Sequence, residues 1–333
     1  MRRSFIKNCL GIAFSAGLPG TLALRHGIAG ATLKYPDRPI RLVVTFGAGG
    51  LADVVARLVA TNLSQELGQS VVVENRAGAS GAIGAQAVAR AAPDGYVLMS
   101  GTPSTQIINK LIYKDLSYDP RRDFIPVSLL GETPLVVTVT PKLKVNSLAE
   151  LVEYAKANPD KLTYASAGVG TSPHLAMEML KLVTGTQILH IPYKGGGEAA
   201  NAAIAGQVDV FVEALPVVGP HITGGTLRAL AVPRKTRLAA LPNIPTAAEA
   251  GFPEYVVPSP WSGVIAPAGT PAGILSILEQ ALTKTLSDTE LRQNLKNRGV
   301  LVAEPGPKPY QALLDQEWAL WSNVVKKANI TAG

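Results

Sequence analysis

The sequence predicts an α/β fold divided between two lobes, and three observations lead to this prediction. From Pro36 onward, short apolar runs rich in β-branched residues alternate with helical patterns, which is typical of βα units and a mainly parallel sheet. The runs are more numerous than one small sheet comfortably holds: 40–46, 71–74, 97–101, 135–140, 162–165, 188–191, 208–212, 227–232 and 263–266. Two proline-containing segments, 130–134 and 255–260, stand where the chain would cross between lobes, which predicts one lobe of residues 32–133 and 258–333 and another of 134–257.

The first strand, turn and helix predict an anion site. Residues 40–46 read as a strand covered on both faces, and apolar residues recur at helical spacing from Asp53 onward. The turn between them is GAGG at 47–50. Glycines let a ligand approach the main chain, and the first N–H groups of a helix are unpaired and lie at the positive end of its dipole. The alternative is that these glycines only permit a tight turn.

A second segment of the same kind follows the run 162–165. Small and hydroxyl-bearing residues extend from Ser166 to Ser172, where a cap and Pro173 predict a helix start. Free N–H and hydroxyl groups would converge there on a carboxylate, unless the serines only cap local structure. Ser147 with Glu150 forms a capping box for another helix, and Thr270-Pro271 and the run 309–328 predict two more.

The beginning of the chain predicts export. Arg2, Arg3 and Lys7 precede a weakly apolar segment, and small residues end it at Ala31, so residues 1–31 are predicted to be a signal peptide. The paired arginines are also typical of a twin-arginine signal, and both export routes stay open. The expected location is the periplasm. Because Cys9 is the only cysteine, the mature chain should contain no disulfide.

Composition excludes several other classes of protein. After removal of the signal, 27 basic side chains face 24 acidic ones, and no basic cluster longer than two residues remains, so a nucleic-acid partner is not expected. His174, His190 and His221 are far apart in the sequence and lack metal-ligand spacing. We therefore expect neither a metal nor a cofactor.

Several stretches together resemble one family. They are YPDRPI at 35–40, FGAGG at 46–50, VENRAG at 73–78, APDGY at 92–96, YASAG at 164–168, HIPYKG at 190–195 and APAGTP at 266–271. With these motifs the chain resembles the solute receptors of tripartite tricarboxylate transporters, also called Bug receptors. The resemblance covers essentially all of the predicted mature chain, and it rests on the number and order of the motifs.

The resemblance implies a two-lobe fold like that of type II periplasmic binding proteins, with a hinged cleft for a small carboxylate, often a dicarboxylate. One carboxyl group would be met by loop 46–53 and the other, across the cleft, by loop 166–172. The implied ligand-binding residues are Phe46, Gly49, Gly50, Asp53, Thr102, Ser166, Gly168, Thr171, Ser172, Tyr193 and Glu213. The implied partners are the carboxylate and, transiently, membrane transporter subunits, with the receptor itself a monomer and not an enzyme.

Two departures from the family pattern leave the ligand open. The family usually has prolines where this chain has Gly47-Ala48, and aspartate where Glu213 stands. Contact of Lys194 with the ligand is also open.

Other functions remain as alternatives. Gly47-x-Gly49-x-x-Ala52 after a strand, with Glu74 ending the next strand, also fits the fingerprint of an exported dinucleotide-binding oxidoreductase. A receptor that presents its ligand to a membrane sensor would use the same fold. A hydrolase is less favoured, because GASGA at 78–82 lacks the last glycine of the nucleophile elbow.

Overall fold

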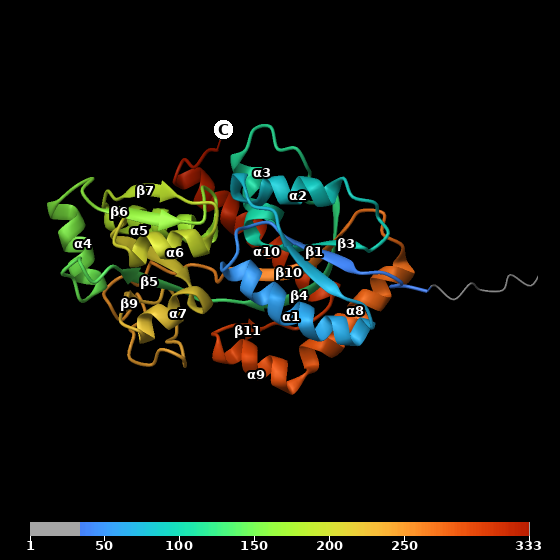
Figure 1. Ribbon diagram of the computed structural model, residues 1–333. Coiled ribbons are helices and arrows are strands. Elements are labelled where there is room, and N and C mark those ends of the chain that lie inside the picture. Colours follow the sequence, from blue (N-terminus) through green and yellow to red (C-terminus); the bar gives the residue numbers. More distant parts are fainter. Residues whose placement is uncertain (1–33, 333) are drawn as a thin grey trace, which may run out of the picture. The chain divides into compact units, whose positions relative to one another are not determined.

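The computed structural model describes residues 34–332, which belong to one compact unit and contain two β-sheets. Figure 1 shows the sheets side by side, each with helices packed on it. This arrangement confirms the predicted α/β fold with two sheets. The predicted signal peptide, residues 1–31, lies outside the described residues.

The first sheet has six strands in the order β11-β4-β10-β3-β1-β2. Their bounds are β1 (Ile40–Val44), β2 (Val71–Asn75), β3 (Val97–Gly101), β4 (Phe124–Glu132), β10 (Trp261–Pro267) and β11 (Leu301–Val302). The helices that accompany it are α1 (Leu51–Leu67), α2 (Ala82–Ala89), α3 (Asn109–Ile112), α8 (Ala272–Ser287), α9 (Thr289–Asn297) and α10 (Pro307–Lys327). Two short turns, η1 (Ala79–Gly81) and the π-helical η2 (Ser104–Ile108), complete this part.

The second sheet has five strands in the order β7-β6-β8-β5-β9. They are β5 (Leu135–Val139), β6 (Thr163–Ser166), β7 (Leu189–Pro192), β8 (Val210–Ala214) and β9 (Arg228–Ala231). The helices are α4 (Leu148–Ala157), α5 (Ser172–Thr184), α6 (Gly196–Ile204) and α7 (Leu215–Thr223).

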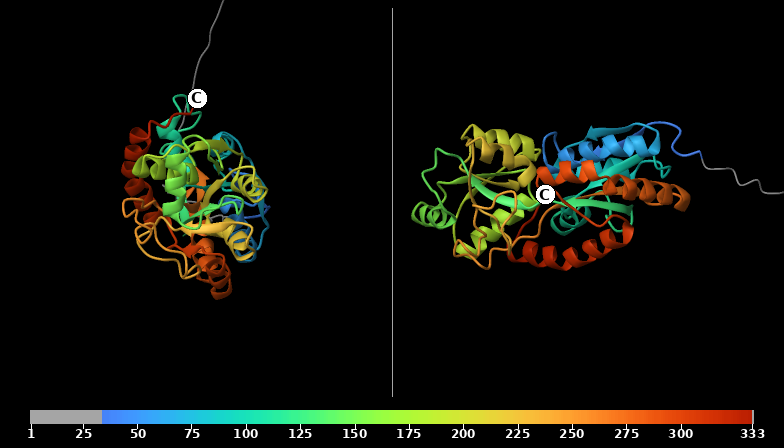
Figure 2. Two further views of the ribbon diagram at one scale, coloured as in Figure 1. Left: turned by 90° about the vertical axis from the view of Figure 1, so that its left-hand side faces the viewer. Right: turned by 90° about the horizontal axis from the view of Figure 1, so that it is seen from below.

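Alternation along β1 explains how the first sheet is covered on both faces. Ile40, Leu42 and Val44 pack into the cluster made with α1, α8 and α9, whereas Val43 packs into the cluster that contains residues of α2, η2 and α10. The right-hand view in Figure 2 shows α1, in blue, and α10, in red, on opposite sides of this sheet. A strand buried on both faces, apart from the exposed Arg41, is what the apolar run predicted.

Both sheets are mixed, which corrects the expectation of mainly parallel sheets. Strand β1 is parallel to β2 and β3, and β6 is parallel to β7 and β8, but β10, β11, β5 and β9 pair antiparallel to their neighbours. The reason is the path of the chain. It passes directly from β4 into β5 in the other sheet, and returns from β9 to β10, so these strands are not parts of βα units.

All nine predicted strands are present, and two others, β4 and β11, were not predicted. Strand β4 contains Pro126, which has no N–H to donate to a ladder, and a proline within a run is unfavourable for a strand. In the structure Pro126 lies opposite Ile265, where the register between β4 and β10 shifts, so the irregularity accommodates it. Strand β11 has only two residues, too few for a sequence pattern.

The two segments that connect the sheets are hydrogen-bonded to each other. The backbone N–H and the hydroxyl of Thr133 both donate to the carbonyl of Pro260, at 2.8 and 3.1 Å. The proposed lobe boundaries near residues 133 and 258 fall on these segments and stay a prediction.

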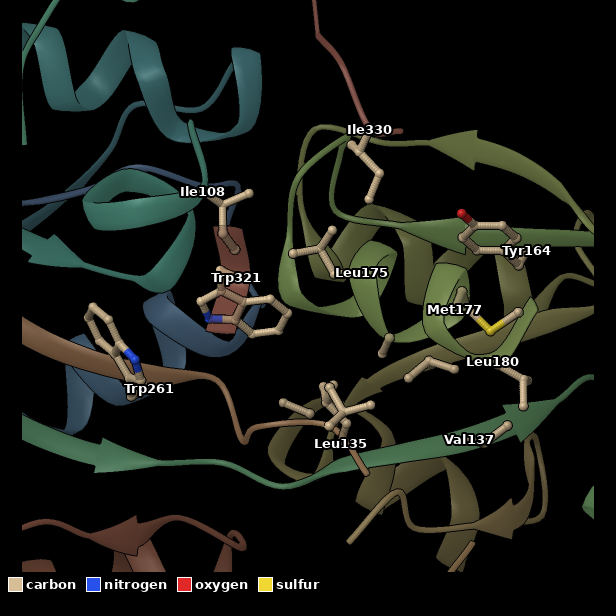
Figure 3. Packing of buried hydrophobic residues seen from close by; sticks show 14 of the residues in the cluster. Ile108, Leu135, Val137, Tyr164, Leu175, Met177, Leu180, Trp261, Trp321 and Ile330 are labelled. Carbon is tan, nitrogen blue, oxygen red and sulfur yellow. The ribbon is translucent and has the colours of Figure 1, made fainter. Parts of the chain in front are cut away.

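An apolar cluster continues through both sheets. It contains Trp261 and Trp321 beside the first sheet, and Leu135 and Leu175 in the second. Figure 3 shows Trp321 between Trp261 and Leu175, with Ile330 above Leu175. Helix α10 and its following residues therefore link the two sheets, since α10 packs on β4, η2 and α5.

The helix caps agree with the sequence signals for α4 but not for α5 and α8; α8 begins at Ala272, so Pro271 rather than Thr270 is its N-cap. Ser147 caps α4 by accepting the N–H of Glu150 at 3.1 Å, and the Glu150 carboxylate accepts the N–H of Asn146 at 2.8 Å. Helix α5 begins at Ser172, so Thr171 rather than Ser172 is its N-cap. Within residues 34–332, none of the helices has both the length and the apolar character needed to cross a membrane.

Candidate functional site

Three helix N-termini converge on one cavity of about 50 Å³ between the sheets. A cavity of this size has room for several water molecules. Each of the three helices contributes residues of its N-terminal end. The rest of the wall comes from residues that follow β1, β3 and β6, from β8, and from the start of β10. The lining residues are Phe46, Gly50, Leu51, Ala52, Thr102, Pro103, Ser104, Ala167, Thr171, Ser172, Pro173, Gly196, Glu213, Pro260 and Trp261.

The loop before α1 is held in shape by Asp53. Its carboxylate accepts the N–H of Gly49 at 2.9 Å, the Arg57 side chain at 3.0 Å and the Asn75 amide at 2.9 Å. Burial by itself would raise the pKa of Asp53, but these hydrogen bonds outweigh it and lower the pKa below its ordinary value. Asp53 is 4% exposed and does not line the cavity, so its contacts shape the glycine loop from behind. Gly49 has φ of +77°, a conformation that favours glycine.

Ser166 holds the facing loop, 166–172. Its hydroxyl oxygen lies 2.6 Å from Nε2 of His190 and accepts the N–H of Gly168 at 3.1 Å. The Thr171 hydroxyl donates to the Gly168 carbonyl at 2.8 Å. Ser166 is fully buried and does not line the cavity, whereas Thr171 and Ser172 do. The Ser172 hydroxyl makes no hydrogen bond with the described residues, which leaves it available to a ligand.

A cluster of three rings supports this loop. The ring centroid of His190 lies 4.7 Å from that of Tyr164 and 4.4 Å from that of His174, and the latter two are 6.4 Å apart. Burial lowers the pKa of His174 to about 4 and that of His190 to about 3, so both rings are neutral near pH 7. His174 Nδ1 accepts the N–H of Gly170 at 3.2 Å, and this further fixes the loop.

Glycines bring the two sides of the cavity into direct backbone contact. A Cβ added at Gly195 would lie 2.9 Å from the Gly47 nitrogen, and one added at Gly197 would lie 2.5 Å from the Ala48 carbonyl oxygen. Side chains are therefore excluded from this contact. On another part of the same interface, the Ser80 hydroxyl donates to the Val169 carbonyl and Ser104 donates to Gly170 at 3.2 Å. Loop 46–50 therefore lies directly against residues 195–197.

Glu213 is the acidic member of the lining. It is 3% exposed, and its Oε1 accepts the N–H of Ala214 at 2.8 Å. Burial raises the pKa of Glu213 to about 7, against the opposing effect of that N–H. None of the lining residues is a lysine or an arginine. An anion in this cavity would therefore be held by helix N-termini, backbone N–H groups and hydroxyls.

Six of the predicted site residues line the cavity and five do not. Those in the lining are Phe46, Gly50, Thr102, Thr171, Ser172 and Glu213. Gly49, Asp53, Ser166 and Gly168 belong to the two loops behind it, and Tyr193 is half-buried and donates its N–H to the Ser166 carbonyl at 2.9 Å. Lys194 is exposed and outside the lining. Ligand contact by any of these residues stays a prediction.

Sequence reasoning missed several lining residues. Pro103 and Ser104 directly follow Thr102 at the end of β3, so the strand end itself was a usable signal. Gly196 lies in the glycine run 195–197, directly after the HIPYKG motif, and also lines the cavity. Trp261 follows the second crossing segment and gave no local signal of its own.

Two alternatives lose their local support. The N–H of Gly49, part of the backbone that a dinucleotide pyrophosphate would approach, is bonded to Asp53. Ser80 has φ of +51°, as a serine on a tight elbow can, but its hydroxyl donates across the interface to Val169 and no histidine is bonded to it. Within the described residues, no group of histidine, cysteine and acidic side chains is arranged to hold a metal ion.

The fold and cavity define a two-lobed solute-binding protein. The family described as tripartite tricarboxylate transporter family receptor matches residues 55–330, and the chain belongs to this family. Protein BugT of Bordetella pertussis is 38% identical over 294 residues, which cover 88% of this chain and 90% of BugT.

Solved structures of similar proteins contain dicarboxylates. Rpa4515 of R. palustris, solved with adipate, is 37% identical with a TM-score of 0.86, and the match covers 89% of this chain and 99% of that one. MatC of Rhodopseudomonas palustris, solved with bound malate, is 33% identical with a TM-score of 0.83, covering 87% and 100%.

Proposed function

We propose that this chain is a periplasmic receptor that captures a small dicarboxylate in the cavity between its sheets and delivers it to membrane subunits of a tripartite tricarboxylate-type transporter. The observation that carries the proposal is the convergence of the N-termini of α1, α5 and α6 on a cavity without lysine or arginine. Helix N-termini favour anions through unpaired N–H groups and the helix dipole. Adipate and malate in the similar proteins support a dicarboxylate.

Two loops are proposed to grip the two ends of the ligand. On one side Phe46 and Gly50 present the start of α1, and on the other Thr171 and Ser172 present the start of α5. Thr102 and Glu213 are proposed to contact the ligand between them. Gly49, Asp53, Ser166 and Gly168 then act by holding the loops in shape, and Tyr193 by fixing β7 to Ser166.

Opening and closing of two lobes is proposed to report occupancy. Because both loops line one small cavity, a ligand can contact both only in the closed form, so binding favours closure. A membrane partner can then distinguish loaded from empty receptor by lobe geometry. The proposed lobes are residues 32–133 with 258–333, and 134–257, joined near Thr133 and Pro260.

The receptor is further proposed to be a monomer without enzymatic activity, exported by the segment 1–31. Presentation of the ligand to a membrane sensor would use the same closed form and remains the second candidate. An oxidoreductase is not supported, since the chain belongs to a receptor family.

Calorimetric titration of the purified, ligand-stripped receptor with malate, adipate and matched monocarboxylates tests the proposal. At least one dicarboxylate should bind, and mass spectrometry should recover it unchanged. Ser172→Ala should weaken binding by about 1–3 kcal/mol, because a buried carboxylate oxygen loses its partner. The matched control is Ser276→Ala on the exposed face of α8, which should bind as the wild type does. Absence of binding for the whole panel, or turnover of a bound compound, would refute the proposal.

A further inference from the structure

Glu213 lies in the cavity without a countercharge. It is the penultimate residue of β8, and Oε1 is occupied by the Ala214 N–H. Oε2 is directed toward the start of α6, because a Cβ at Gly196 would lie 2.7 Å from it. No other residue in the cavity lining is an acid, a base or a histidine. A buried carboxylate without a cationic partner is strongly disfavoured relative to the neutral acid.

The charged groups on the surrounding elements are occupied elsewhere. Strand β5 has no titratable residue, and none of the titratable residues on the other packed elements lines the cavity. On β6 and α5, Tyr164 and Lys181 both bond to Glu178, and His174 stacks on His190. On α6 Glu198 accepts the N–H of Lys194, on α1 Asp53 is paired with Arg57, and His221 of α7 bonds to Thr226. Burial raises the pKa of Glu213 to about 7, and no neighbouring charge contributes to this shift.

An enclosed anion would add a second negative charge to the same small space. The helix N-termini that favour the ligand carboxylate provide partial charges only, with no full positive charge to balance two anions. Two carboxylates that share a site do not both stay ionised, and one takes a proton. The ligand carboxylate faces the helix N-termini, which favour its ionised form, so Glu213 is the carboxylate that takes the proton.

We propose that Glu213 is the specificity-determining acid of this receptor: it takes one proton from solvent as the ligand is enclosed and, as a neutral acid, donates a hydrogen bond to an oxygen of the ligand. This inference rests on the proposed function. The proton is placed on the carboxyl oxygen that faces the cavity, and no bond of the ligand is broken. A ligand with an oxygen acceptor at its second end binds to the protonated acid, whereas a ligand with an ammonium group there binds only to the ionised carboxylate and takes up no proton.

Proton uptake measured by calorimetry tests the inference directly. The receptor is titrated with adipate or succinate between pH 5.5 and 8.5, in two buffers of different ionisation enthalpy. The wild type should take up a maximum close to one proton per ligand, and by linkage its association constant should fall by up to about tenfold per pH unit where uptake is greatest. Glu213→Gln should lose the uptake, and its association constant should become independent of pH. The control Glu198→Gln, at the exposed start of α6, should retain the wild-type uptake.

Selectivity gives a second readout. Adipate and 5-aminopentanoate share one chain and one carboxylate, as do succinate and 3-aminopropanoate, and differ only in carboxylate against ammonium at the other end. At pH 6 the wild type should prefer the dicarboxylate at least tenfold, and this preference should fall as the pH rises, because only the dicarboxylate needs the protonated acid. A preference that does not change with pH, or wild-type binding of the dicarboxylate without proton uptake at any pH, would overturn the inference while leaving carboxylate binding intact.

A ligand-free measurement keeps the inference testable if no member of the panel binds. The infrared difference spectrum of wild type minus Glu213→Gln at pH 6 should contain the carbonyl band of a protonated carboxylic acid that disappears toward pH 8.5. Subtraction is needed because burial also raises the pKa of Glu317 to about 7. Lack of this band at pH 6 would show that Glu213 is ionised and refute the proposal, whereas failure of all ligands to bind would refute the proposed function.

Discussion

Gly197→Ala is expected to hinder closure of the receptor without destabilising its fold and without changing the lining of the cavity. Gly197 lies in the first turn of α6 and does not line the cavity. A Cβ there would lie 2.5 Å from the Ala48 carbonyl oxygen, so loop 47–50 must retreat by about 0.9 Å to reach an ordinary contact of about 3.4 Å. Alanine suits a helix better than glycine, by about 0.5–1 kcal/mol. The substitution should therefore leave the fold as stable or more stable while opposing the closed form.

The expected loss of affinity follows from the cost of forcing a methyl group into a packed contact. That cost is about 1–3 kcal/mol. If only the closed form encloses the ligand, the dissociation constant for adipate or malate should rise by roughly 5- to 150-fold. Calorimetric titration measures this change, thermal unfolding measures stability, and small-angle scattering should show a larger radius of gyration with ligand than for the wild type.

Gly273→Ala is the matched control. It is the same substitution in the first turn of α8, where an added Cβ has no neighbour within 4 Å. The control should bind and close as the wild type does. If Gly197→Ala also binds with wild-type affinity and gives the wild-type scattering change, the glycine contact plays no part in capture and the reasoning is refuted.

Three further predictions follow from other contacts. Ser80→Ala removes the hydrogen bond from Ser80 to loop 166–172, so ligand release measured by stopped-flow fluorescence should become about 2- to 10-fold faster. The unfolding temperature should change little. An unchanged release rate would exclude a role of this hydrogen bond in closure. Burial lowers the pKa values of His174 and His190, so the unfolded chain binds more protons than the folded one and stability falls as the pH drops below about 6.5. Burial raises the pKa of Glu317, so the folded chain binds the additional proton and stability rises as the pH drops from about 7 to 4.5. Between about pH 6.5 and 4.5, Glu317→Gln should therefore lose up to about 1.4 kcal/mol of stability relative to the wild type for each unit by which the pH falls. Denaturant titrations measure this, and parallel pH profiles would contradict it. Intact mass of the exported protein should correspond to a chain that begins near Thr32, and retention of residues 1–31 would disprove the signal peptide.

Local signals in the sequence determined most elements and the segments that surround the cavity. The apolar run before Gly47 predicted β1, because such a run, rich in β-branched residues, suits a strand covered on both faces. The Ser147–Glu150 pair predicted the start of α4. Such signals act within a few residues, so one sequence is enough to read them. The family motifs added the two loops, and both border the cavity.

Only the tertiary structure decided which residues of those loops face the cavity. Ser166 and Ser172 have the same chemistry and both follow the pattern of an anion loop, yet Ser166 is turned toward His190 and Ser172 toward the cavity. His190 is 24 residues away from Ser166, and no local pattern connects them. The burial and raised pKa of Glu213 were likewise decided by contacts between distant segments. Its sequence neighbours make it a strand residue, but the packing of α6 and of loop 46–50 around it removes water and every countercharge. Burial and charge depend on contacts between distant segments, so they are properties of the folded chain and not of any stretch of its sequence.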